Sequence, residues 1–439
     1  MGTKNVFGCI KEVESMSLEA DFVIVHANEL VTLSGFSNKP KIKEEMNELN
    51  MILDGAVAVK DGRIIAVGAT NEVLAELNDG YEIIDASGKL VTPGLVDPHV
   101  HLVFAGTRED ELEKMAVLGV SYLEIKEQGG GMNKSLKLTA ETSFNEQIAI
   151  TSNILDKMLI HGTCTIEAKS GYEMTFEGEI KQLEIIRKLN EIHPLDLIPT
   201  FLAQGIPPKN ENKVDELVDE IAEKWIPEIS KRNLAEYADV FCEKGYYNLE
   251  QTRKILLSAR KHGLKLRNHC DWLAHSGGTR LSAEIGNLTS IDHLIWTPIS
   301  EVEEIKNQDT IVVFLPTSPF CYVNKYAPAR EIIDCGLPVA LATDVSAANL
   351  CESMQMMMTL AILKMKMTAA EALSAATINA AHSIDRAHEI GSLEVGKKAD
   401  IVIYDAPNHR FFAYNYGINL AEKVFKNGKL VAERGRRSL

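Results

Sequence analysis

A repeated alternation of short apolar runs with helix-length stretches through the middle of the chain is the feature that most constrains its fold. The helix-length stretches, such as Glu179–Ile192 and Asn248–His262, carry one apolar face. Apolar strands that alternate with helices form parallel sheets with right-handed crossovers. Eight such units predict a (β/α)8 barrel of the TIM type, in the α/β class, rather than an open sheet. The predicted strands are Leu95–Val103, Thr163–Lys169, Leu197–Gln204, Tyr237–Cys242, Lys265–Asp271, Ser290–Leu294, Thr310–Leu315 and Pro338–Thr343.

Both ends of the chain show a different pattern, with short β-rich runs broken by glycine, aspartate and serine. The segment Lys60–Arg63, reading KDGR, is typical of a hairpin turn, and the pair at 427–428, reading NG, is typical of another. We therefore expect one small composite β-sandwich domain made from residues 20–92 and 390–435. The barrel, predicted to span residues 93–389, is inserted within it.

Composition narrows the possible partners and the compartment. The chain has 439 residues and a net charge of −16, which disfavours nucleic acid and anionic membranes as partners. Its seven cysteines lack CxxC spacing, and this usage predicts a reduced, cytoplasmic protein. We find no signal-peptide pattern in residues 1–19, which we expect to form a polar tail. No apolar run reaches the roughly 18 residues of a membrane span.

Polar side chains stand at the predicted carboxyl ends of the barrel strands, where barrel enzymes place their chemistry. His99 and His101 end the first strand and, being two residues apart, point to the same side. His269 stands near the end of the fifth strand, and Asp344 directly follows the eighth. Three imidazoles and one carboxylate suit a single divalent ion, zinc or iron, with an open position for water.

Other polar residues extend the predicted site. His293, at the end of the sixth strand, can orient a water or polarise a carbonyl, and Asp344 can also carry a proton. Arg108 can hold a substrate carboxylate in a bidentate fork, or it can form a surface salt bridge with the acidic residues that follow it. We expect Lys169 to form a structural ion pair with Glu167, the alternative being a carbamylated ligand that bridges two metal ions.

Several motifs across residues 20–435 resemble the amidohydrolase superfamily and, within it, the imidazolonepropionase family. They are PGLVDPHVHLVFAGTRED, SYLEIKEQGGGM, GTCTIEAKSGYEM, ADVFCEKG, YAPAREIID, PVALATD and AATINAAHSIDRAHEIGSLEVGKKADIVIYD. The resemblance implies a barrel beside a composite β domain, with one zinc or iron ion. It also implies hydrolysis of the lactam C–N bond of 4-imidazolone-5-propanoate to N-formimino-L-glutamate, a step of histidine degradation.

The resemblance also assigns roles to residues of this chain. It implies substrate binding through the carboxylate-holding Arg108, with Tyr122 and Tyr172 in family positions, and catalysis through His293. It implies metal binding by the set already found at the strand ends, namely His99, His101, His269 and Asp344.

This chain departs from the family pattern at three pocket positions. Trp272 stands where the family has a glutamate for proton transfer, Gln204 where it has a histidine, and Ser346 where it has an asparagine. Tryptophan carries no acid–base group and would stack on a planar ring or fill space. Two interpretations follow: Asp271 or Asp344 takes over the proton transfer for the same reaction, or the substrate is another ring.

The sequence therefore predicts a metal-dependent hydrolase of a small cyclic amide, with 4-imidazolone-5-propanoate as the first substrate candidate. A sister amidohydrolase or deaminase that acts on another small N-heterocycle is the alternative within the same class. A non-catalytic, ligand-binding barrel is the alternative of another class, and it predicts either no bound metal or metal without hydrolysis. We expect a homodimer, because barrels of this kind often dimerise.

Overall fold

An eight-stranded parallel sheet forms the larger part of the protein, in a computed structural model that describes residues 18–306, 308–323 and 325–438. Neighbouring strands pair in chain order, as the alternation of strands and helices predicts. All eight predicted strands are present, most of them one to three residues shorter than expected. They are β8 (Leu95–Val100), β9 (Thr163–Lys169), β10 (Asp196–Ala203), β11 (Tyr237–Cys242), β12 (Lys265–Cys270), β13 (Ser290–His293), β14 (Ile311–Phe314) and β15 (Val339–Leu341).

Backbone hydrogen bonds join the segment after β15 to β8 and bring the two edges of this sheet together. The N–H of Asp344 donates to the carbonyl of His99 at 3.2 Å, and the N–H of His101 donates to the carbonyl of Val345 at 2.9 Å. The sheet thereby curls into a barrel, and the predicted fold class is confirmed. The same bonds place the first and last strand ends beside each other.

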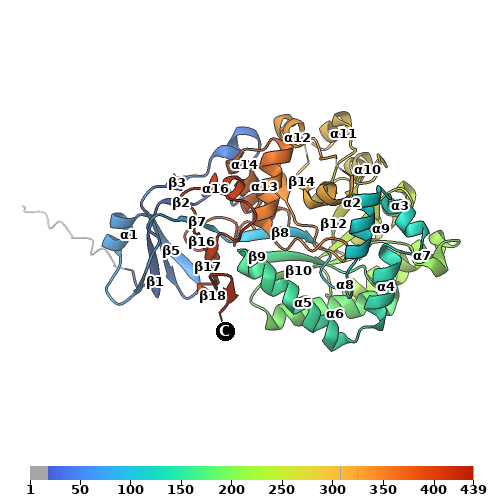
Figure 1. Cartoon of the computed structure of the whole chain (residues 1–439), viewed down its shortest axis with the longest axis horizontal. Helices are drawn as coiled ribbons and strands as arrows, with labels where there is room; N and C mark the ends of the chain where they lie inside the picture. The colour runs from blue at the N-terminus through green and yellow to red at the C-terminus, as the bar shows by residue number, and fades with distance from the viewer. Residues whose placement is uncertain (1–17, 307, 324, 439) are drawn as a thin grey trace, which may run out of the picture.

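Helices cover the outside of the barrel (Figure 1). A capping box at Thr368 and Glu371 opens one of them, with the Thr368 hydroxyl accepting from the Glu371 N–H. Met354, Met357 and Met358 are fully buried in another helix, so these methionines pack against the barrel. The helices are α5 (Phe144–Ile160), α6 (Phe176–Ile192), α7 (Val214–Glu220), α8 (Ile226–Lys231), α9 (Leu249–Lys261), α10 (Gly278–Ile285), α11 (Ile299–Glu304), α12 (Ala329–Cys335), α13 (Met354–Met365), α14 (Ala369–Ala375) and α15 (Ile378–His382).

The connection from β8 to α5 contains three further helices. They are α2 (Glu109–Leu118), α3 (Tyr122–Glu127) and α4 (Met132–Glu141), and they lie on the side of the barrel away from β1 (Figure 1). The triple glycine at 129–131 joins α3 to α4. This long connection carries Arg108 and Tyr122 over the carboxyl ends of the strands.

Two smaller sheets are built from the chain ends. The four-stranded sheet has the order β5-β4-β1-β6, and the seven-stranded sheet has the order β19-β18-β17-β16-β7-β2-β3. Ile24, Val57, Val91, Ile401 and Phe425 belong to one buried cluster between the sheets, as a composite sandwich requires. The strands are β1 (Phe22–Ala27), β2 (Glu29–Val31), β3 (Met51–Ile52), β4 (Gly55–Lys60), β5 (Arg63–Ala69), β6 (Glu82–Asp85), β7 (Leu90–Pro93), β16 (Ile401–Tyr404), β17 (Ala421–Lys426), β18 (Lys429–Glu433) and β19 (Arg436–Arg437).

The two predicted hairpin turns join β4 to β5 and β17 to β18, and they touch each other. Asp61 and Gly62 in the first turn, and Asn427 and Gly428 in the second, have positive φ angles of 49°, 75°, 48° and 74°. A Cβ atom on Gly62 would lie 2.7 Å from the carbonyl oxygen of Asn427. This close approach fastens the N-terminal sheet to the C-terminal strands.

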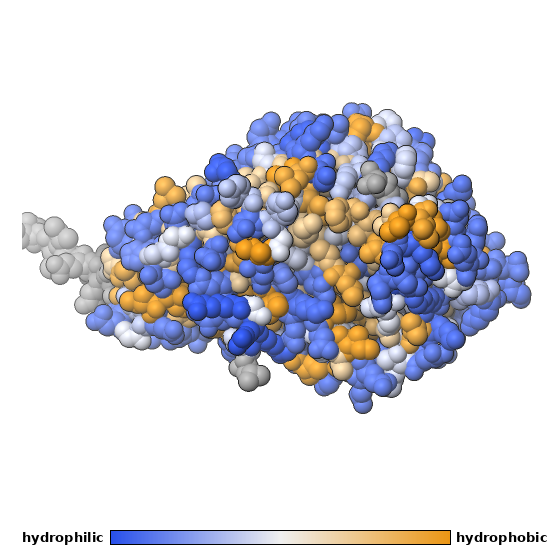
Figure 2. Space-filling view, in the orientation of Figure 1, coloured by the Kyte–Doolittle hydropathy of each residue, from blue (hydrophilic) through white to orange (hydrophobic). Residues whose placement is uncertain are grey.

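The exterior agrees with the charged composition. Hydrophilic side chains dominate the face shown in Figure 2, with apolar groups scattered among them. Among the described residues, no helix is long and apolar enough to cross a membrane. Residues 1–17 of the predicted polar tail lie outside the described residues, while the N–H of Leu18 donates to the carbonyl of Glu76.

Candidate metal centre and substrate pocket

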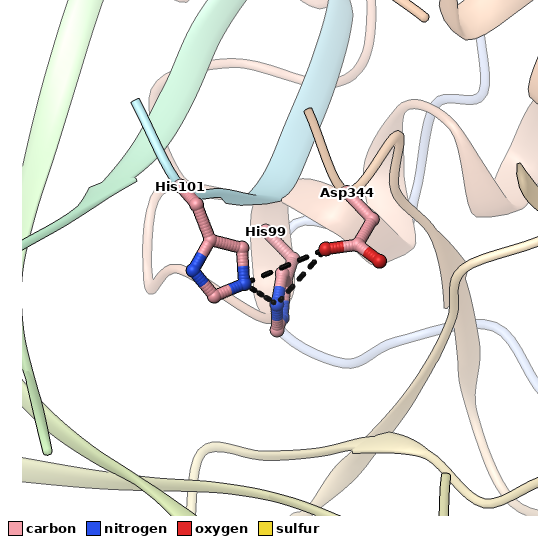
Figure 3. A group of neighbouring side chains, drawn as sticks. All are labelled: His99, His101 and Asp344. Atoms are coloured by element: carbon pink, nitrogen blue, oxygen red, sulfur yellow. Dashed lines mark hydrogen bonds and ion pairs between the residues drawn. The ribbon is translucent and has the colours of Figure 1, made fainter. Parts of the chain in front are cut away.

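Three of the predicted metal ligands point toward one another at the carboxyl end of the barrel (Figure 3). The Nε2 atoms of His99 and His101 lie 3.2 Å apart. The Oδ1 atom of Asp344 lies 3.4 Å from Nε2 of His101 and 3.9 Å from Nε2 of His99. The ring of His269 lies beside these three side chains, with its centroid 5.3 Å from that of His99 and 5.8 Å from that of His101. The structure thus brings together the ligand atoms of three residues of the predicted set, with the fourth, His269, next to them.

The chemistry of these donors fits a divalent metal ion. Burial lowers the pKa of His99 and His101 well below the usual range, so both imidazoles are neutral and have a lone pair to offer. The Nδ1–H of His99 donates to Asp292 at 2.6 Å, which leaves its Nε2 lone pair facing the group. Two nitrogen ligands at about 2.0–2.1 Å from one tetrahedral zinc lie about 3.3 Å apart, which agrees with the observed separation.

Asp344 supplies the carboxylate of the group. Its side chain is buried, and burial raises its pKa well above the usual range. A positive ion beside a buried carboxylate favours the ionised form. The backbone of Asp344 has a φ of 59°, an uncommon conformation for a non-glycine residue that recurs at functional sites.

His293, like His269, lies beside the three side chains that point toward one another. Its ring centroid is 5.7 Å from that of His99 and 5.8 Å from that of His269. Burial lowers the pKa of His293 well below the usual range, so this imidazole is also neutral. Within the described part of the chain, its Nδ1 atom has no hydrogen-bond partner. A neutral imidazole with a free nitrogen can donate to, or accept from, a bound molecule.

A pocket opens above these side chains and is lined by aromatic and polar residues. Every substrate-contacting residue predicted from the sequence faces it, together with Phe241 and Tyr322, which were not predicted. Aromatic walls suit a flat ring, and the few polar groups fix its orientation. The predicted residues in the wall are Arg108, Tyr122, Tyr172, Gln204, Trp272 and Ser346.

Arg108 is buried in the pocket wall, so its ion pair with one of the acidic residues that follow it is not on the surface. Only 6% of the residue is exposed, and its Nη1 atom lies 3.8 Å from Oε2 of Glu111, which is buried as well. Burial lowers the pKa of Arg108, but the hydroxyls of Tyr122 and Tyr172 outweigh it, and the net shift is upward. The guanidinium therefore remains charged and available to an anionic group.

Trp272 forms part of an aromatic wall that lies between Arg108 and the candidate metal ligands. Its ring stacks on His293, with centroids 5.6 Å apart and planes inclined by 26°, and meets Tyr122 edge-on at 5.5 Å. Its backbone N–H donates to Oε2 of Glu243 at 2.7 Å. Among the described residues, no group accepts from its indole Nε1. Trp272 therefore packs against His293, and its indole N–H remains free to donate to a ligand.

Asp271 does not face the pocket, so its proposed role in proton transfer is wrong. Its Oδ1 atom accepts from the N–H and hydroxyl of Ser276 at 2.6 and 2.8 Å. Its Oδ2 atom accepts from the hydroxyls of Thr279 and Thr297 at 2.9 and 2.8 Å. Both oxygens are used to shape the loop after β12, which leaves Asp344 as the carboxylate of the site.

The sequence interpretation missed the charged groups beneath the site. Asp239 accepts from Nδ1 of His269 at 3.1 Å, and Asp292 accepts from His99. The predicted ion pair of Lys169 with Glu167 is present at 2.9 Å. A signal for the missed residues existed, because carboxylates that interrupt apolar strands must be paired when they are buried.

Comparison with known proteins places the chain among hydrolases. The model of the Amidohydrolase family matches residues 90–431. The imidazolonepropionase of Geobacillus kaustophilus is 45% identical over 415 residues, which is 93% of this chain and 97% of that protein. The imidazolonepropionase of Alkaliphilus metalliredigens is 44% identical, with 95% of this chain and 99% of that protein covered.

Solved structures support the fold. A zinc-bound adenosine deaminase from Xanthomonas campestris superposes with a TM-score of 0.69 at 17% identity, covering 96% of this chain and 95% of that chain. At this identity the likeness concerns the barrel and its flanking sheets.

Proposed function

The chain belongs to the amidohydrolase family and, within it, to the imidazolonepropionases, and we propose that it hydrolyses 4-imidazolone-5-propanoate in histidine degradation. One water adds across the lactam C–N bond of the ring, and the product is N-formimino-L-glutamate. The proposal is carried by the nearly full-length match to curated imidazolonepropionases. The pocket agrees with this proposal, because the buried Arg108 and several of the candidate metal ligands line the same pocket.

The residues that would hold the metal ion are the four that meet at the strand ends. One ion, zinc or iron, fits three imidazoles and one carboxylate. When bound, such an ion acts as a Lewis acid that lowers the pKa of water and polarises a carbonyl group. The residues are His99, His101, His269 and Asp344.

The chain's own side chains supply the remaining steps. Asp344 accepts the proton of the attacking water and passes it to the ring nitrogen that leaves. His293 donates a hydrogen bond to the carbonyl oxygen, where negative charge develops. Arg108 binds the propanoate carboxylate, with Tyr122 and Tyr172 beside it. Trp272 closes the aromatic wall and keeps bulk water away from the reacting bond.

A direct assay tests this proposal. The purified protein is given 4-imidazolone-5-propanoate, and N-formimino-L-glutamate is measured by mass spectrometry, with a panel of imidazoles, hydantoins and purines run in parallel. We expect turnover of the imidazolone, its loss on treatment with a chelator, and its loss in His269→Ala. Turnover of another ring alone would overturn the proposal.

A second candidate is a sister amidohydrolase or deaminase for another small N-heterocycle. Trp272 favours it, because an aromatic side chain fills the position of the family's acidic group. Turnover of a purine or hydantoin with none of the imidazolone is the result that supports it. Metal binding without hydrolysis of any ring would instead support a ligand-binding barrel.

The remaining features of the proposal concern the state of the protein. We expect one ion per chain, a carboxylate-bearing substrate, a cytoplasmic location and a homodimer. Elemental analysis gives the identity and number of the metal ions, and light scattering gives the mass in solution. A ratio of two ions per chain, or a monomeric mass, would contradict the corresponding expectation.

A further inference from the structure

A fully buried network of charged side chains lies beneath the candidate metal ligands. We propose that Lys169 and Arg267 are positioning residues, which lock two carboxylates, Asp239 and Asp292, against the metal-ligating histidines and thereby set how tightly the ion is held. The inference rests on the proposed metal centre. It concerns residues that touch neither the substrate nor the ion.

The first half of the network fixes His99. Asp292 accepts from Nδ1 of His99 at 2.6 Å and from Nη2 of Arg267 at 3.3 Å, and its other oxygen accepts from Ser290 at 2.6 Å. Arg267 also donates to the backbone carbonyls of Pro98 and Ser383, both at 2.8 Å. Since the carbonyl of Pro98 belongs to the residue before the ligand, Arg267 holds both the backbone and the side-chain partner of His99.

The second half fixes His269 in the same manner. Oδ2 of Asp239 accepts from Nδ1 of His269 at 3.1 Å and from Nζ of Lys169 at 2.8 Å. The same ammonium donates to Oε1 of Glu167 at 2.9 Å. These carboxylates and the lysine are fully buried. Each of the two ligand histidines therefore has its own carboxylate, and each carboxylate has its own cation.

The two cations matter because a buried carboxylate is costly unless it is paired. A carboxylate that accepts from the far nitrogen of a metal-ligating imidazole fixes the tautomer and makes the ligand more basic. Burial opposes the charge on Lys169, but Asp239 and Glu167 outweigh it, and the pKa of Lys169 is raised. Lys169 and Arg267 thus hold both acceptors in place.

This arrangement also decides the alternative role of Lys169. His99, Asp239 and Asp292 offer ligand atoms close enough for a second cation. Lys169 and Arg267 already contact one oxygen, Oδ2, of each of these carboxylates. The Nζ atom of Lys169 contacts two carboxylates, which are partners of an ammonium and would repel a carbamate. These contacts favour the structural ion pair expected for Lys169 over the carbamylated, bridging lysine that was its alternative.

The chain offers a matched control in a second buried lysine. Nζ of Lys426, which is 2% exposed, donates to Asp196 and to Asp400, both at 2.7 Å. This cluster joins the seven-stranded sheet to the first residue of β10. Like Lys169, Lys426 contacts two carboxylates, but neither of them contacts a candidate metal ligand.

The experiment compares Lys169→Met, Arg267→Met and the control Lys426→Met in the full chain. Each protein is loaded with zinc or cobalt, and two quantities are measured without substrate: the rate of metal loss to a chelator and the visible spectrum of the cobalt form. We expect the first two variants to lose metal about 10- to 100-fold faster than the wild type, with a changed cobalt spectrum. We expect the control to lose thermal stability and keep both metal properties.

Should the lysine or arginine variant fail to fold, Asp239→Asn and Asp292→Asn test the same contacts with nearly unchanged shape. Wild-type rates and spectra in the variants would overturn the positioning role, while a wild-type protein that takes up no metal would overturn the metal centre itself. An equal effect of Lys426→Met on the metal properties would also count against the positioning role, because it would trace the effect to general instability.

Discussion

The mouth of the barrel and the sheets of the chain ends use their buried polar groups in opposite ways. In the sheets, buried charged side chains find partners within the protein: Glu29 accepts from His409 at 2.8 Å, and Lys426 is held by two carboxylates. At the mouth, the described residues leave Nε of Arg108, Nε1 of Trp272 and Nδ1 of His293 without hydrogen bonds. The paired charged groups help to hold the fold together, and these three unpaired groups at the mouth are available to a ligand.

This contrast predicts that a substitution at the mouth of the barrel causes the largest loss of activity and little loss of stability. In Asp344→Asn the shape is kept, but the proton carrier and one metal ligand are impaired. We expect kcat to fall by about 10³- to 10⁴-fold. We also expect the thermal midpoint of the metal-free protein to stay the same or to rise, because a buried carboxyl with a raised pKa has been removed. Turnover assays and calorimetry check both, and a clear fall in the midpoint would break the contrast.

Arg108→Gln should have the next largest effect on activity. The charged hydrogen bonds from Arg108 to the substrate carboxylate contribute about 1.5–3 kcal/mol, so we expect kcat/KM to fall about 10- to 100-fold, mainly through KM. The propanamide analogue, which lacks the negative charge, should distinguish poorly between variant and wild type. Lys134→Gln is the control, because Lys134 pairs with Asp110 on the surface of the same connection. An equal loss with the propanamide would argue against carboxylate binding.

Most of the fold could be predicted because the apolar runs are long and regular. The first strand shows where this method fails. Leu95–Val103 was expected, but β8 ends at Val100, although Leu102, Val103 and Phe104 are also buried. Hydropathy indicates burial but not strand pairing. A buried apolar segment that follows a strand without pairing therefore makes the predicted strand too long.

The candidate site could be predicted only where sequence spacing fixes direction. His99 and His101 were placed together because residues two apart in a strand share a face. Asp271 was misjudged because the backbone turns at that residue, with a φ of 55°, and the side chain points into its own loop. The support of His269 by Asp239 was not foreseen, because it depends on the neighbouring strand.

Glu179→Gln should change how the stability of the protein depends on pH. Glu179 lies in α6, its Oε1 atom accepts from the N–H of Met174 at 2.7 Å, and burial raises its pKa to about 7. The folded state therefore binds this proton more tightly than the unfolded state, and stability falls as pH rises from about 4.5 to about 7. We expect the variant to be more stable than the wild type by up to about 3 kcal/mol at pH 8 and equal to it near pH 4. Urea unfolding at both pH values measures this, and a difference independent of pH would contradict it.

The smallest effect belongs to the contact between the hairpin turns of the chain ends. Gly62→Ala meets two costs, the left-handed backbone at φ 75° and the carbonyl oxygen of Asn427 at 2.7 Å. Gly88→Ala meets only the first, because its φ is also 75° but nothing lies within 4 Å of the added Cβ. We expect Gly88→Ala to lower the free energy of unfolding by about 1 kcal/mol and Gly62→Ala by about 2 kcal/mol, with kcat unchanged in both. Equal losses would mean that the approach of the two turns adds nothing, and a loss of activity would tie the sheets to the mouth of the barrel.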